Sequence, residues 1–195
     1  MIRLFTALCK VLLTKISEEE AFYVAMEEIG IFRTSCPKCG TVGRFSEYGN
    51  YDRGHVTYSD DEILDFRVRP RRIKCLSCGA SHALLPDTLT PYSPYTLRFK
   101  LLVLIAYSGR DTTVANICGK FGIAVSTLYE WKKIMTTHKD FMLGLLISRK
   151  TPALCFLRGL LGATDISEIL RGFFSKYGFA FMQDASMSVT RPVPT

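Results

Sequence analysis

The stretch CPKCG at residues 36–40, with its counterpart CLSCG at residues 75–79, decides the fold. A Cys-x-x-Cys turn places two thiolates on one side of a tight loop, and the glycine after it lets backbone amides fold towards the sulfurs. Two such turns supply four soft ligands in a tetrahedron, which suits zinc and leaves no open position for a catalytic water. The sequence therefore predicts a structural zinc site with four ligands, Cys36, Cys39, Cys75 and Cys78.

Other interpretations of these cysteines stay open at this stage. The two pairs are farther apart than in short zinc fingers, so they could be unrelated turns or redox pairs. Iron also binds four cysteines. His55 and His82 could each replace a ligand, although four cysteines already complete a tetrahedral set. The other three cysteines, Cys9, Cys118 and Cys155, lie in apolar surroundings and are expected to be small buried hydrophobes.

Short strands are predicted between the two cysteine turns, because aromatic and β-branched residues alternate with glycines there and no helical period appears. We expect strands at residues 42–48, 55–58 and 63–73, a turn at 59–62, and a Pro-containing linker at 85–92. In the third strand, apolar residues alternate with basic ones, so one face would be strongly basic. That face either contacts phosphates or is a solvated face that discourages edge pairing. Its basic residues are Arg67, Arg69, Arg71, Arg72 and, just beyond, Lys74.

Helical patterns flank this region. Ser17 is a candidate N-cap for a helix over residues 17–29, and Ser93-Pro94 predicts the start of a helix over 95–108 that ends at Gly109. Asp111 or Thr112 would cap a helix reaching about Phe121, and another would run from about residue 126 to 138. Further helices are expected at 153–161 and 166–177, before a polar tail.

Residues 114–133, VANICGKFGIAVSTLYEWKK, have the pattern of two helices joined by a tight turn. Cys118 is the small residue where the backbones approach, and Gly122 tolerates the positive φ of the turn. Leu128 and Trp131 would point into the core. An ordinary helical hairpin is the alternative. On the outer face, the residues expected to contact phosphates or base edges are Ser126, Thr127, Tyr129, Glu130, Lys132 and Lys133.

The run FGIAVSTLYEW at residues 121–131 closely resembles the helix-turn-helix of bacterial site-specific recombinases and insertion-sequence transposases. A zinc ribbon just before such a unit also resembles the N-terminal DNA-binding region of many transposases, and short transposase-related bacterial proteins of unassigned function. The resemblance covers about residues 33–139. It implies duplex DNA as the partner, and it leaves open a homodimer and a transposase or recombinase partner.

No catalytic site is expected. Transposases of this type cut DNA with three carboxylates that hold two metal ions on a large domain. Asp165, Glu168 and Asp184 lie too close together in the sequence for that arrangement. The sequence therefore predicts a non-catalytic DNA-binding protein. Two alternatives are a targeting subunit or remnant of a transposase whose catalytic domain is absent or on another chain, and a zinc-ribbon module that binds RNA or protein.

Composition agrees with a folded polyanion-binding protein. The chain has 195 residues, 48% of them hydrophobic, and a formal net charge of +7. We expect an α+β fold, with a small antiparallel zinc ribbon followed by a helix-turn-helix domain. The expected segments are 1–32, 33–90, 91–150 and 151–195. Seven cysteines with two metal-type pairs, and no apolar run long enough for a membrane span, predict a cytoplasmic, nucleoid-associated protein with no membrane contact.

Overall fold

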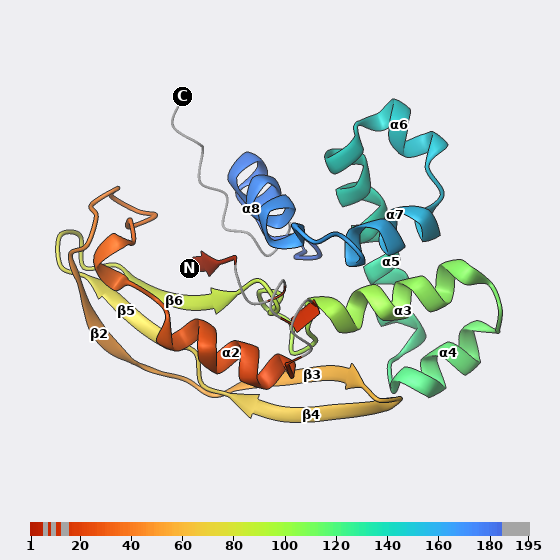
Figure 1. Cartoon of the computed structure of the whole chain (residues 1–195), viewed down its shortest axis with the longest axis horizontal. Coiled ribbons are helices and arrows are strands. Elements are labelled where there is room, and N and C mark those ends of the chain that lie inside the picture. Colours follow the sequence, from red (N-terminus) through yellow and green to blue (C-terminus); the bar gives the residue numbers. More distant parts are fainter. Residues whose placement is uncertain (6–7, 9–10, 13–15, 185–195) are drawn as a thin grey trace.

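The computed structural model describes residues 1–5, 8, 11–12 and 16–184. The predicted α+β class is confirmed: sheets that carry the cysteine cluster form the N-terminal part, and helices form the rest (Figure 1). Cys9 and the tail from residue 185, for which the sequence made predictions, lie outside the described residues.

The larger sheet has the strand order β1-β6-β5-β2. The strand pairs within the predicted ribbon, residues 33–90, are antiparallel, but β1 from the N-terminal segment adds an unpredicted parallel strand beside β6, with Ile2 opposite Leu84. The two remaining pairs, β2 with β5 and β5 with β6, are antiparallel. The strands are β1 (Ile2–Leu4), β2 (Phe45–Asn50), β5 (Arg71–Cys75) and β6 (Ser81–Pro86).

A separate two-stranded sheet is the hairpin of β3 (Arg53–Ser59) and β4 (Glu62–Val68). Its turn matches the predicted one, with Asp60 and Asp61 both at positive φ (51° and 62°). The prediction of one strand over residues 63–73 is wrong. Pro70 lacks an N–H for a strand ladder, and the chain passes there from β4 in one sheet to β5 in the other. The linker predicted at 85–92 also begins too early, because β6 continues to Pro86.

One face of the larger sheet is covered by α2 (Glu18–Glu27), and η1 (Ile31–Arg33) follows it. Ser17 caps α2 as predicted, with its Oγ accepting a hydrogen bond from the Glu20 amide at 3.0 Å. Phe22 and Met26 of this helix are buried with Ile73 and Leu84 of the sheet. This small core is largely apolar and includes two of the cysteines.

Six helices build the second part of the described chain; three of them start or end differently from the prediction, and α6 was not predicted. The helix expected at 95–108 starts after Thr96, whose Oγ accepts from the Phe99 amide at 3.2 Å. The next starts after Thr113, not Asp111 or Thr112. The helices predicted at 153–161 and 166–177 have those bounds. The six are α3 (Leu97–Gly109), α4 (Val114–Phe121), α5 (Val125–Leu143), α6 (Leu145–Lys150), α7 (Ala153–Leu161) and α8 (Ile166–Tyr177).

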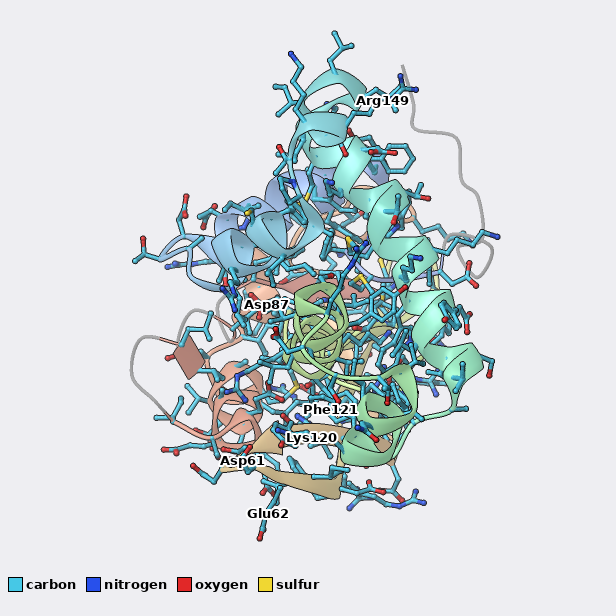
Figure 2. The ribbon with its side chains drawn as sticks, turned by 90° about the vertical axis from the view of Figure 1, so that its right-hand side faces the viewer. Asp61, Glu62, Asp87, Lys120, Phe121 and Arg149 are labelled. Atoms are coloured by element: carbon cyan, nitrogen blue, oxygen red, sulfur yellow. The ribbon has the colours of Figure 1, made fainter. Side chains whose placement is uncertain are left out.

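A buried carboxylate joins the two parts. Asp87 follows β6 and accepts hydrogen bonds from the Leu8 amide at 2.9 Å and from the Ser167 hydroxyl at 2.5 Å. Burial raises the pKa of Asp87, while these bonds and nearby Arg3 oppose the shift. The sheet end, the N-terminal segment and the start of α8 therefore meet at one interior polar group (Figure 2).

His138 of α5 is also buried, with 2% of its surface exposed. Its Nδ1 accepts a hydrogen bond from the Met182 amide at 3.0 Å, and its ring lies 5.2 Å from the rings of Phe173 and Phe179. Burial lowers the pKa of His138 to about 4; Asp184 opposes the shift and Lys100 adds to it.

We expect His138 to make the fold sensitive to acid. Its folded-state pKa lies below the unfolded value of about 6.5, so the stabilisation is complete above that pH and is lost as the pH falls towards 4. The loss should be roughly 3 kcal/mol, because one pKa unit corresponds to about 1.4 kcal/mol. Urea unfolding at pH 7, 5.5 and 4 measures it. The variant His138→Gln should lose less stability over that range than the wild type, and parallel pH profiles would contradict this assignment.

Candidate metal centre and nucleic-acid interface

The four predicted ligands come together as one cluster. Their Sγ atoms all lie within 4.8 Å of one another, with 3.7 Å between Cys36 and Cys78 and 3.7 Å between Cys39 and Cys75. Cys36 and Cys75 are buried, while Cys39 is exposed. Four sulfurs at this spacing fit a tetrahedral ion such as zinc and have the donor chemistry that it prefers.

Each cysteine turn is closed by the same local hydrogen bonds. The Cys36 amide donates to Thr41 O at 2.9 Å, and the Gly40 amide donates to Cys36 O at 2.8 Å. In the second turn, Cys75 and Gly79 donate to Ala80 O and Cys75 O, both at 2.9 Å. Both glycines have positive φ, 73° and 70°. Glycine adopts that conformation without steric cost, which is why it follows each pair.

Sheet register then brings the two turns together. Phe45, just beyond the first turn, lies opposite Cys75 in the β2–β5 ladder. The Leu76 amide of the second turn donates to Arg44 O at 2.9 Å. The long gap between the two pairs is thus spanned by β2, the β3–β4 hairpin and β5.

Neither histidine belongs to the four-sulfur cluster, but His82 contacts it. Its Nε2 lies 3.3 Å from Cys36 Sγ, and both residues are buried. The Met1 nitrogen lies 3.4 Å from Nδ1, so the ring accepts there and carries its proton on Nε2. His82 is therefore placed to donate to the Cys36 thiolate. His55 is elsewhere, 3.5 Å from the Glu18 carboxylate.

The segment 114–133 folds as two helices joined by a tight turn. Gly122 has φ of 58°, and the Ile123 amide donates to Cys118 O at 3.1 Å, which closes α4. Leu128 and Trp131 are buried, with 0% and 4% exposure, as predicted. No side chain caps α5, which starts after Ala124 and runs to Leu143, five residues past the predicted end.

Among the predicted contact residues of α5, all but Thr127 are exposed; Thr127 is half-buried. Lys132 Nζ lies 5.3 Å from the ring centre of Tyr107 and 5.8 Å from that of Tyr129. An aromatic and basic cluster therefore flanks the outer face of the helix. Tyr107 of α3 was not foreseen, because its proximity to α5 depends on the packing of two helices. The exposed set is Ser126, Tyr129, Glu130, Lys132 and Lys133.

Glu130 has a cationic neighbour inside the protein. Lys100 of α3 is 3% exposed, donates to Met182 O at 3.4 Å, and lies over the Trp131 ring at 5.3 Å. Burial lowers the pKa of Lys100 to about 7, and the charge of Glu130 opposes that shift. Lys100 and Glu130 therefore interact electrostatically.

The tip of the β3–β4 hairpin supports the turn between α4 and α5. Lys120 Nζ of α4 lies 3.3 Å from Asp61 Oδ1, and the Tyr58 and Phe121 rings are 4.9 Å apart (Figure 2). A Cβ added at Gly122 would lie only 3.3 Å from Ile63 Cδ1. The sequence predicted the turn at residues 59–62 but not its contact with α4.

The predicted basic face does not exist as one surface. Arg67 is exposed on β4, Arg69 pairs with Asp52 at 3.2 Å in the connection, and Arg71 lies on β5. Arg71 donates to Met26 O at 2.8 Å and to the Glu47 carboxylate, so it is committed to the fold. Arg72, also on β5, donates to Ser81 Oγ at 3.1 Å. Because the strand ends before Pro70 and β5 belongs to the other sheet, these arginine side chains do not share one face of a single strand.

The comparisons with known proteins bear on this same region. Residues 36–131 match the model of a family described as a domain of unknown function, DUF6431. The DUF6431 match begins at the first cysteine of the cluster and ends at Trp131, so it includes the four cysteines, α4 and the first part of α5. No curated protein and no solved structure matches the chain. Within the described residues, every helix is too short or too polar to cross a membrane.

We expect Cys75→Ala to abolish metal binding and unfold the larger sheet, since structural zinc contributes about 10 kcal/mol or more to folding. Elemental analysis should find about one zinc per wild-type chain, as a single site with four cysteine ligands requires. Circular dichroism should show loss of strand signal in the variant. Cys155→Ala is the matched control, because Cys155 is exposed and outside the cluster. A metal-free wild type that stays folded would contradict the assignment.

We expect His82→Ala to release zinc faster, because the Cys36 thiolate would lose a hydrogen bond that disperses its charge. Lost outer-shell bonds typically cost 10- to 100-fold in metal affinity, so roughly tenfold faster transfer to a chelator is expected. His82→Gln retains an N–H donor and should recover part of the loss. His55→Gln is the control and should behave as wild type. Equal release rates for all four proteins would reject this role.

Proposed function

We propose that this protein binds duplex DNA through α5 and performs no catalysis itself. The observation that carries the proposal is the α4–α5 unit: two helices around a glycine turn, with Leu128 and Trp131 inside and a polar, basic face outside. A helix presented in this way fits the major groove, where its N-terminal residues reach base edges. Ser126 and Tyr129 would contact bases or phosphates, and Lys132 and Lys133 would contact phosphates.

The acidic residue on this face fits the proposal. A carboxylate facing DNA repels phosphates unless it accepts from a cytosine amino group. In this proposal Glu130 accepts from a cytosine amino group, the base contact that suits a carboxylate.

The metal centre has a structural role in this proposal. A set of four cysteine ligands leaves no position for a reacting water when zinc is bound. A bound metal would join the start of β2 to the end of β5, and the chain between them forms the β3–β4 hairpin, whose tip contacts α4. The ribbon thus steadies the α4–α5 unit.

The resemblance to transposase DNA-binding regions supports the same function, with a DNA-targeting subunit or remnant of a transposase as the alternative. One of the scattered carboxylates is used elsewhere, because Glu168 pairs with Arg171 at 3.1 Å. A ribbon module that binds RNA or protein is the second alternative. A nuclease that co-purifies with the chain and cuts DNA only in the mixture would favour the subunit alternative.

We expect a gel shift with duplex DNA that exceeds the shift with single-stranded RNA of equal length, at each of several salt concentrations. Lys133→Ala should weaken duplex binding and reduce the salt slope by about one, as expected for one lost phosphate contact. Tyr129→Ala should also weaken binding. Zinc content should stay unchanged in both.

Lys150→Ala is the matched control, because Lys150 is an exposed lysine of α6, away from the outer face of α5. It should bind like the wild type. If both α5 variants bound every duplex as tightly as the wild type, α5 would not be the DNA-contacting helix. A wild-type protein that prefers RNA would replace the proposed function with the second alternative.

A further inference from the structure

We propose that the solvent face of the larger sheet is a second DNA contact, which binds phosphate groups of a DNA duplex. The inference rests on the proposed function and extends it from one helix to a second surface. It starts from the two faces of the sheet. Ile73 and Leu84 point into the core with α2. Because strand side chains alternate, Arg72 and Lys74 point the other way.

Sheet register shows what else lies on that solvent face. Lys74 lies opposite Ser46 of β2 and Ser81 of β6, and Arg72 lies opposite Ala83. Tyr48, two residues after Ser46, is on the same face and is 50% exposed. These positions combine two cations, a phenol and two hydroxyls, and none of them is acidic. The phosphate-contact surface, as we name it, consists of Ser46, Tyr48, Arg72, Lys74 and Ser81.

The two cations are held in place by one ring. The Arg72 guanidinium carbon lies 5.3 Å, and Lys74 Nζ 5.6 Å, from the centre of the Tyr48 ring. Arg72 also donates to Ser81 Oγ at 3.1 Å. Cations fixed in this way lose less conformational freedom when they bind an anion.

Like charges on neighbouring positions of one sheet face repel each other unless an anion lies between them. Among the described residues, no carboxylate pairs with Arg72 or Lys74, whereas Arg71 is paired with Glu47 and Arg69 with Asp52. Protection of a sheet edge does not explain the charges either, because β5 is an interior strand between β6 and β2. The arrangement is that of a site for an external anion.

A phosphodiester backbone is the anion that fits this surface best. Guanidinium and ammonium groups both bind phosphate, and serine hydroxyls and a phenol add donors. Proteins that bind single strands stack bases on free aromatic faces. Here the Tyr48 ring already contacts two cationic groups, so it organises charge instead of offering a base platform. This favours a duplex backbone over single-stranded RNA.

The test uses the full-length, zinc-loaded protein and compares a random-sequence DNA duplex with single-stranded RNA of equal length at several salt concentrations. The double variant R72A/K74A should bind more weakly, and its slope of log K against log salt should fall by about two, because each lost phosphate contact removes about 0.9. Tyr48→Leu keeps both charges but frees them, so it should weaken binding with little change in slope. Tyr48→Phe keeps the ring that contacts both cations and loses only the hydroxyl donor, so it should lose less binding than Tyr48→Leu.

The matched control is R149A/K150A, which removes the same charge from α6, far from the larger sheet (Figure 1). It should leave the slope unchanged, and all variants should keep wild-type zinc content. If R72A/K74A binds like the wild type while Lys133→Ala weakens binding, the second contact is wrong and the function of α5 stands. If the wild type binds no duplex, both proposals fail. If R72A/K74A loses binding only to single-stranded RNA, the surface exists but duplex DNA is not its partner.

Discussion

The meeting of four sulfur atoms within 4.8 Å is the constraint on which the arrangement of the N-terminal half depends. The sheet and α2 share a core of modest size, and thiolates crowded together repel one another unless a cation lies between them. A bound metal ion would turn that repulsion into attraction and join the two turns, which lie far apart in the sequence. His82 on β6 would reinforce the centre through Cys36.

The consequences extend to the helices through the hairpin. When the two cysteine turns lie together, the residues between them must form a loop that starts and ends at the cluster. Within this loop, β3 and β4 pair as an antiparallel hairpin. The hairpin tip then reaches α4, where Asp61 pairs with Lys120 and Ile63 packs at Gly122. The cysteine cluster and the α4–α5 unit are therefore coupled through contacts, which agrees with one family match that spans both.

Charge is used in two ways along the chain. Some cations are committed to the fold: Arg71 binds the C-terminal end of α2, and Lys100 lies inside beside Trp131. Others are left to solvent on ordered surfaces, as Lys132 is beside Tyr107 and Arg72 beside Tyr48. The net charge of the chain does not distinguish cations bonded within the fold from cations on the surface. The partner of each cation does.

The sequence by itself determined what is local. Conformational preferences of neighbouring residues predicted several features that the structure has. These are the two Cys-x-x-Cys-Gly turns, the Ser17 cap, the Gly122 turn and the helices at 153–161 and 166–177. Burial of Leu128 and Trp131 also follows from helical period. Cys155, expected inside, is exposed, because an apolar neighbourhood in sequence does not say which side of α7 is covered.

Only the tertiary structure decided which distant segments meet. Three contacts join residues far apart in the chain: β1 with β6, His82 with Cys36, and Lys120 with Asp61. The change of sheet at Pro70, which divides the basic run, also depends on which strands pair. Such contacts depend on the register of strands and the packing of helices on them. A local pattern carries no information on either, because the same alternation of residues can pair in several registers.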